Sequence, residues 1–372
     1  MSIEVQELPC REGSVGVITL NTPETLNALS GDMIDRMQMT LDGWAASPEI
    51  CLVVLRGAGE KGFCAGGNIR ELYQALSPQE TGEADEPARA AGYFAREYRL
   101  DYTVHQFPKP VITLAHGAVM GGGLGLLNAS RYRLVTPDIV MAMPEISIGL
   151  FPDVGASWFL NRLPGRLGLF MGLTGARLNV SDAMRVGLAD MVLQPEQAEG
   201  LVSRLQQERW SGECAVDDNR LFRLFRQLEL PDYRALPESE LARHEQTIAR
   251  LSAGDHLPEI VDRILDADEQ SVWWQAATAN LRGGCPVTAW LVWTQLRKAQ
   301  QMSLKDIFRM ELTMATRCTE RPDLREGIRA RLIDRDQSPR WSFGSVAEVP
   351  EDVVESHFIP TLDDSTDPMK LD

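Results

Sequence analysis

Two neighbouring stretches of the chain decide its fold: the apolar run VITLA at residues 111–115 and the glycine cluster MGGGLG at residues 120–125. The apolar run is typical of a buried β-strand, and the cluster continues into LGLL, which could open a helix. Glycines at a strand-to-helix turn leave backbone N–H groups uncovered and let a ligand approach the main chain closely. These stretches therefore predict an α/β element that carries an exposed-amide turn.

A second glycine turn, AGG at residues 65–67, also follows a strand candidate and precedes a helix candidate. Two backbone N–H groups that converge on one oxygen form an oxyanion hole, and each such donor lowers a reaction barrier by about 3 kcal/mol. Glycine runs are, however, explained equally well by tight packing of a helix against a sheet. A dinucleotide fingerprint would place Leu126 or Asn128 at its last position, and no Gly-Lys-Ser/Thr ending indicates a phosphate loop.

Two carboxylates lie eight positions apart in an otherwise apolar segment, Glu145 in MPE and Asp153 in FPDVG. An ionised Glu145 among apolar neighbours is costly unless it has partners, and burial raises a carboxyl pKa toward values that suit proton transfer. Asp153 follows a proline and by itself reads as a turn residue. Together with the amide turns, the pair favours chemistry at a carbonyl whose oxygen becomes negative, and hence an enzyme.

The composition is that of an acidic globular protein of 372 residues, 44% of them hydrophobic, with a formal net charge of −16. This charge favours solubility and argues against a broad nucleic-acid or anionic-membrane surface. The six cysteines form no CxxC pair, so zinc and dithiol signatures are missing. The acidic first residues do not resemble a signal peptide, and no apolar stretch approaches the ~18–20 residues of a membrane span. We therefore predict a cytoplasmic protein with reduced thiols.

Strand and helix candidates alternate up to about residue 193, which is typical of an α/β fold. The strand candidates are residues 15–20, 51–56, 111–115, 132–135 and 139–143, and the helix candidates are 30–44, 69–76 and 88–105. An acidic stretch with two prolines, residues 77–87, is predicted to be a loop. Only helices are expected beyond residue 194, at 196–208, 221–228, 238–253, 257–268, 286–302 and 305–319. We therefore predict an α/β core over residues 1–195 and a helical region over residues 196–372.

Residues 62–69 (GFCAGGNI) and 116–123 (HGAVMGGG) resemble the crotonase (enoyl-CoA hydratase/isomerase) superfamily. Within it, residues 142–155 (AMPEISIGLFPDVG) are similar to the 3-hydroxyisobutyryl-CoA hydrolase family, and so are residues 325–330 (REGIRA) and 332–341 (LIDRDQSPRW). The resemblance spans nearly the whole chain. It implies a crotonase-like α/β core, a ββα superhelix, followed by a C-terminal helical region.

The resemblance also assigns roles to individual positions. Gly67 and Gly122 match the family's backbone donors to the thioester oxygen, and Glu145 and Asp153 match its catalytic acidic pair. Glu97, on the helix after the acidic loop, matches a substrate-contacting carboxylate, so the expected substrate-binding set is Glu97, Gly122, Glu145 and Asp153.

Two departures from the related patterns bear on the reaction. The resemblance implies that a crotonase-type hydratase would use two glutamates. The first of these would fall at Gly125, which cannot supply a base. Simple hydration of an enoyl-CoA is therefore disfavoured. The hydrolase family commonly has aspartate after the paired glycines, whereas this chain has Asn68, which we expect to change a local hydrogen bond.

The expected activity is hydrolysis of a short branched 3-hydroxyacyl-CoA thioester, and the resemblance suggests 3-hydroxyisobutyryl-CoA, an intermediate of valine degradation. Glu145 would act as base toward water or attack directly to give an acyl anhydride. The resemblance implies no metal or redox cofactor. Coenzyme A is part of the substrate and is not counted as a cofactor. An acyl-CoA is the expected partner, without nucleic acid or membrane, and a homo-oligomer is compatible with the family. The alternatives are a hydratase or isomerase acting on another acyl-CoA, and a non-catalytic acyl-CoA-binding protein.

Overall fold

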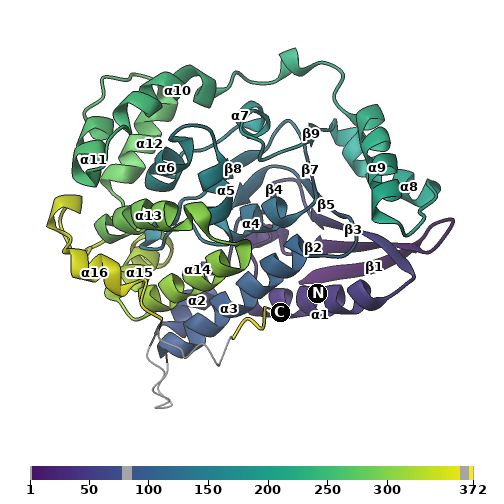
Figure 1. The fold of residues 1–372 in the computed structure, drawn as a ribbon, viewed down its shortest axis with the longest axis horizontal. Coiled ribbons are helices and arrows are strands. Elements are labelled where there is room, and N and C mark those ends of the chain that lie inside the picture. Colours follow the sequence, from purple (N-terminus) through teal and green to yellow (C-terminus); the bar gives the residue numbers. More distant parts are fainter. Residues whose placement is uncertain (1, 78–85, 361–367, 372) are drawn as a thin grey trace. The chain divides into compact units, whose positions relative to one another are not determined.

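The computed structural model describes residues 2–77, 86–360 and 368–371 (Figure 1). Most of the predicted acidic loop, residues 78–85, lies outside the described residues. The chain forms two compact units. The first unit comprises Met1–Gly67, Leu100–Met141 and Leu178–Ser239, and the second comprises Asn68–Arg99, Ala142–Arg177 and Glu240–Asp372. Each unit thus collects three separate segments, which differs from the division after residue 195 that we predicted.

The first unit is built on a six-stranded sheet whose strands lie side by side in Figure 1, in the order β1-β2-β3-β5-β7-β9. The strands are β1 (Ile3–Pro9), β2 (Ser14–Leu20), β3 (Ile50–Gly57), β5 (Val111–Ala115), β7 (Tyr132–Val135) and β9 (Met191–Val192). Only β1 pairs antiparallel among these described strands, and the remaining pairs are parallel. The predicted strand at residues 111–115 is therefore confirmed as an inner strand of a mainly parallel sheet.

Helices cover both faces of this sheet. Val15 and Val17 of β2 belong to one apolar cluster with side chains of α8 (Pro195–Gln207) and α9 (Cys214–Leu228). Gly16, which points to the opposite face, lies so close to α1 (Gly31–Ala46) that a methyl group on it would be 2.7 Å from the Trp44 ring. The alternation of valine and glycine on β2 thus matches the period of two in a strand buried on both faces.

A smaller three-stranded sheet, in the order β4-β6-β8, carries the glycine turns. Its strands are β4 (Gly62–Cys64), β6 (Ala118–Met120) and β8 (Val140–Ala142), and β4 and β6 run parallel. Strand β6 leads directly into α4 (Gly122–Ala129). The glycine cluster therefore follows a short strand of this smaller sheet rather than the longer strand β5.

The second unit is mainly helical. Its N-terminal segments contribute α2 (Ile69–Ala75), most of α3 (Glu86–His105), the short helix η2 (Glu145–Ile148), α5 (Ala156–Phe159) and α6 (Leu167–Thr174). Its C-terminal segment adds α10 (Glu240–Leu251), α11 (Leu257–Leu265), α12 (Val272–Arg282), α13 (Pro286–Lys298), α14 (Leu304–Thr319), α15 (Pro322–Ile328) and α16 (Glu351–Ser356). In the described part of the chain, all the elements after β9 are helices, as predicted. None of the described helices has the length and apolar character needed to cross a membrane.

Candidate active site

The two glycine turns lie next to each other in the first unit. A methyl group placed on Gly66 would be 3.1 Å from the carbonyl oxygen of Met120 and 3.5 Å from the nitrogen of Gly122. Gly66 has φ = +101° and Gly121 has φ = +48°, values that favour glycine at both turns. The parallel strands β4 and β6 therefore deliver both turns to the same edge of the smaller sheet, as the oxyanion-hole hypothesis requires.

Gly122 is the first residue of α4, so its N–H has no carbonyl four residues earlier within the helix to bind. The next residue, Gly123, allows the start of α4 to touch the end of β4, because a methyl group there would be 2.3 Å from the carbonyl oxygen of Cys64. The turn at Gly66 is fixed on its other side, where its carbonyl accepts a hydrogen bond from Leu29 N–H at 2.8 Å. Backbone contacts thus hold both turns, and the Cys64 thiol adds a 3.8 Å hydrogen bond to the carbonyl oxygen of Gly66.

The three acidic residues that the resemblance selects are all buried in the second unit. Glu97 lies on α3, Glu145 opens η2, and Asp153 follows the Phe151-Pro152 step; their exposed fractions are 3%, 6% and 4%. The Oε1 atom of Glu97 and the Oε2 atom of Glu145 are buried and accept no hydrogen bond from any described residue. Buried carboxylate oxygens are usually hydrogen-bonded, so these two atoms are available to accept hydrogen bonds from a polar ligand or water.

Burial raises the pKa of all three carboxyl groups, and repulsion from Asp153 adds to the rise at the two glutamates. Burial raises the pKa of Glu145 well above its usual value, and the negative charges of Asp153 and then Glu97 add to the effect. The pKa of Glu97 is raised by burial and by Asp153 in the same way. Burial also raises the pKa of Asp153, to about 6. Carboxyl groups in such a cluster cannot all ionise at neutral pH, so the cluster can both hold and accept protons.

Tyr98 is a member of this cluster that the sequence analysis did not select. Its hydroxyl donates a 2.7 Å hydrogen bond to Oδ2 of Asp153, and this bond opposes the rise in the pKa of Asp153. The only signal for Tyr98 in the sequence is its position next to Glu97.

The substitution Tyr98→Phe removes this donor and leaves the ring in place. Because the bond favours the ionised form of Asp153, we expect the pKa of Asp153 to rise further, by about one, as measured by the NMR titration profile of its labelled carboxyl carbon. Tyr233→Phe is the matched control, since the exposed Tyr233 hydroxyl donates in the same way to Glu229. Superimposable profiles for Tyr98→Phe and wild type would remove Tyr98 from this role.

Asn68, the departure from the hydrolase pattern, caps α2. Its side-chain oxygen accepts a hydrogen bond from Glu71 N–H at 3.3 Å, and its own N–H donates to the Tyr93 hydroxyl at 3.3 Å. Asparagine and aspartate are comparable N-caps, so asparagine supplies the capping hydrogen bond here without the negative charge of an aspartate.

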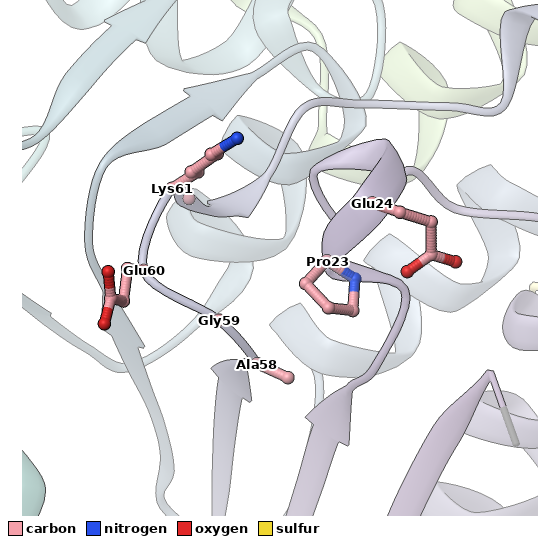
Figure 2. Close-up of a pocket in the computed structure, with 7 residues that line it drawn as sticks. Pro23, Glu24, Ala58, Gly59, Glu60 and Lys61 are labelled. Atoms are coloured by element: carbon pink, nitrogen blue, oxygen red, sulfur yellow. The ribbon is translucent and has the colours of Figure 1, made fainter.

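A surface pocket of about 460 Å³ lies in the first unit, beside the turn that precedes β4 (Figure 2). It is lined by Pro23, Glu24, Ala58, Gly59, Glu60, Lys61 and Gly62. Figure 2 shows the side chains of Glu60 and Lys61 extending in different directions from this turn. The turn is anchored by a 2.8 Å hydrogen bond between the His116 ring and the carbonyl oxygen of Gly59. With one lysine and two glutamates, the charges of the lining do not favour an anionic ligand.

Comparison with known proteins identifies relatives along nearly the whole chain. Residues 15–358 match the family model described as enoyl-CoA hydratase/isomerase. The chain is 38% identical over 348 residues to the mitochondrial 3-hydroxyisobutyryl-CoA hydrolase of Danio rerio, covering 93% of this chain and 87% of that protein. It is 35% identical over 354 residues to the protein of the same name from Gallus gallus, with coverages of 94% and 88%.

A solved structure confirms the predicted fold class. The crystal structure of an enoyl-CoA hydratase from Rhodobacter sphaeroides 2.4.1 superimposes with a TM-score of 0.82 at 34% sequence identity, covering 97% of this chain and 98% of that one. The crotonase-like α/β core with a C-terminal helical region is therefore a shared architecture.

The predicted cytoplasmic location differs from the location given in the names of the relatives. The names of the relatives from Danio rerio and Gallus gallus place those proteins in mitochondria. Our prediction of a cytoplasmic protein rested on the absence of a signal-peptide pattern and on reduced cysteines. Neither observation separates the cytoplasm from a mitochondrial compartment, so the prediction is not supported by these relatives.

The family model, the relatives and the solved structure agree with one another. They also agree with the motifs at residues 62–69, 116–123 and 142–155, from which the family was inferred. The chain belongs to the enoyl-CoA hydratase/isomerase family and, within it, to the group of the 3-hydroxyisobutyryl-CoA hydrolases.

Proposed function

We propose that this chain hydrolyses 3-hydroxyisobutyryl-CoA to 3-hydroxyisobutyrate and coenzyme A, the reaction named for its curated relatives. The observation that carries the proposal is the buried acidic cluster of Glu97, Glu145 and Asp153, in which Glu97 and Glu145 each keep an oxygen without a hydrogen bond from the described residues. A hydroxylated acyl group and a water molecule offer the polar atoms that such a cluster lacks. The reaction would belong to valine degradation.

In the proposed reaction the oxygen of water attacks the thioester carbonyl carbon. The C–S bond then breaks, the acid is released, and the proton lost by water ends on the sulfur of coenzyme A. The N–H groups of Gly67 and Gly122 would stabilise the negative charge that develops on the carbonyl oxygen. Only water and the thioester are consumed, so we propose no cofactor.

Glu145 would accept the proton of the attacking water, or attack the thioester itself to give a mixed anhydride that water then cleaves. Its raised pKa makes the ionised carboxylate a stronger base and reduces the fraction ionised at neutral pH. The rate should therefore increase with pH through the acid limb. Hydroxylamine distinguishes the two routes, because a hydroxamate on Glu145 forms only from an anhydride.

Glu97 and Asp153 would bind the 3-hydroxyl group of the substrate or orient the water. A buried polar group that loses its partner is costly, so a site built for a hydroxyl rejects analogues without it. We expect kcat/KM for isobutyryl-CoA to be at least about 100-fold below that for 3-hydroxyisobutyryl-CoA, measured by thiol release from a panel of purified thioesters. Equal values for the two substrates would contradict this specificity.

Hydration of an enoyl-CoA is the second candidate, because the structurally similar Rhodobacter sphaeroides protein is named an enoyl-CoA hydratase. Against it stands Gly125, which lies within α4 at the position of the expected first glutamate and has no side chain to act as a base. Thiol release and loss of enoyl absorbance, followed with the same protein, separate the two activities. Binding of these thioesters without either signal would indicate a non-catalytic acyl-CoA-binding protein.

A further inference from the structure

Glu311, on α14, is a fully buried carboxylate outside the set that the family resemblance selects. Its Oε2 atom accepts a 2.7 Å hydrogen bond from Gly155 N–H, and its Oε1 atom accepts a 2.9 Å bond from Ser157 N–H. Both donors lie just after Asp153, at the start of α5. Glu311 is therefore bound to the backbone of the segment that carries a candidate catalytic acid, although it lies more than 150 positions away in the sequence.

The backbone between Asp153 and α5 is strained. Val154 has φ = +54° and is buried, and Gly155 has φ = +84°. A left-handed conformation is unfavourable for a β-branched residue, at a cost of roughly 1–3 kcal/mol, and persists only where the surroundings impose it. Here those surroundings are the two bonds to Glu311, together with a 3.0 Å bond from the Gln295 amide to the carbonyl oxygen of Pro152.

Burying an ionised carboxylate costs free energy unless hydrogen bonds compensate for the lost hydration. Burial raises the pKa of Glu311 to about 8, whereas the bonds from Gly155 and Ser157 oppose this rise because they favour the ionised form. The charge of Asp153 also raises it, which shows that the two carboxyl groups interact. When Glu311 is ionised, its bonds from the two backbone N–H groups are charge-assisted and therefore stronger than those to a neutral side chain.

We propose that Glu311 is a positioning residue for the hydrolysis proposed above: through its bonds to Gly155 and Ser157 it fixes the strained segment that presents Asp153. The inference rests on the proposed function. Glu311 itself touches neither substrate nor water in this account, and it acts through the placement of Asp153.

Two substitutions at Glu311, which remove one or both of its hydrogen-bond acceptors, test the proposal. Glu311→Gln keeps one acceptor and places an amide N–H₂ against the other backbone donor, whereas Glu311→Leu removes both acceptors at similar volume. Because small displacements of a reacting group can cost about 100-fold in rate, we expect kcat to fall roughly 10-fold in Glu311→Gln and roughly 100-fold in Glu311→Leu. KM for the thioester should stay within about twofold, since a displaced Asp153 affects the reaction step more than the binding of coenzyme A.

Two control variants, one at the C-cap of α14 and one within the helix, separate positioning from general stability. Glu320→Gln removes an exposed charge that pairs with Arg317, and Leu312→Ala destabilises the buried side of α14. Both should keep the wild-type kcat, and Leu312→Ala should lower the melting temperature. A folded Glu311→Leu enzyme with wild-type kcat, or a loss of kcat in Leu312→Ala of the same size, would overturn the proposal.

Hydrogen exchange of the wild-type protein gives a readout that does not depend on folding of the variants. The amides of Gly155 and Ser157 should exchange slowly, at rates similar to the interior amides of α14. Rapid exchange at both amides would overturn the proposal even if the variants fail to fold. Absence of thiol release by the wild-type enzyme would instead reject the proposed function, and the exchange result would still decide whether Glu311 holds the segment.

Discussion

Replacing Glu145 with glutamine is expected to lower kcat for thioester hydrolysis by about 10²- to 10⁴-fold, the range that a positioned general base contributes. Glutamine has nearly the same size and can still donate and accept hydrogen bonds, so substrate binding should persist and KM should change little. The raised pKa of Glu145 means that burial disfavours its charge, and the neutral amide should therefore leave the melting temperature equal or higher. Initial rates of thiol release and thermal unfolding of the same preparation measure both effects.

The matched control is Glu196→Gln, which makes the same chemical change on an exposed residue in the first turn of α8. It should reproduce wild-type kinetics. Equal rates for Glu145→Gln and wild type would exclude both the general-base and the anhydride route, since each of them needs the carboxylate.

The second large effect concerns the backbone donor at Gly122. Gly122→Pro deletes one N–H at the first position of α4, where proline is well tolerated and no intrahelical hydrogen bond is lost. Loss of one oxyanion donor costs about 3 kcal/mol in the transition state, so we expect kcat to fall by about 10²- to 10³-fold. Steady-state kinetics on 3-hydroxyisobutyryl-CoA measure the loss.

Gly122→Ala is the comparison that isolates the N–H, because alanine adds a methyl group and keeps the donor. The alanine variant should retain most of the activity that the proline variant loses. If both variants lose activity to the same extent, crowding at this turn explains the effect and the Gly122 donor has no demonstrated part in it.

The elements that could be predicted are those with a signal in the local sequence, such as an apolar run or a helix cap. Strands such as β3 and β5 are continuous apolar runs, and α1 is capped by Ser30, whose hydroxyl accepts from Met33 N–H at 3.2 Å as the sequence suggested. Strands β4, β6 and β9 have only two or three residues each and exist because neighbouring strands pair with them. Such pairing has no signal in a local window. Strand β1 lies at the edge of the sheet, where only Ile3 of its seven residues is buried, so it has no apolar run that would predict a strand.

The division into units was unpredictable for a related reason. The boundary expected after residue 195 followed a change in composition, and the structure does show only helices beyond it among the described residues. The compact units instead join segments that are far apart in sequence, such as Asn68–Arg99 with Glu240–Asp372. Long-range packing of this kind is not encoded in composition.

The candidate site shows the same limit. Glu145 stood out as a carboxylate among apolar residues, and the structure buries it as expected. Glu97 was selected only by resemblance, because an acidic residue on a helix with many polar neighbours carries no signal of its own. Glu311 gave no signal either, since its partners are two backbone N–H groups more than 150 positions away. Residues that support a site through the backbone need the structure.

The central claim, that this chain splits a thioester with water, is tested most directly by isotope balance in ¹⁸O-labelled water with 3-hydroxyisobutyryl-CoA. We predict one free thiol and one molecule of 3-hydroxyisobutyrate for each thioester consumed, with label in the carboxylate of the product over repeated turnovers. Consumption of the thioester without release of free coenzyme A, or free coenzyme A without labelled acid, would contradict it.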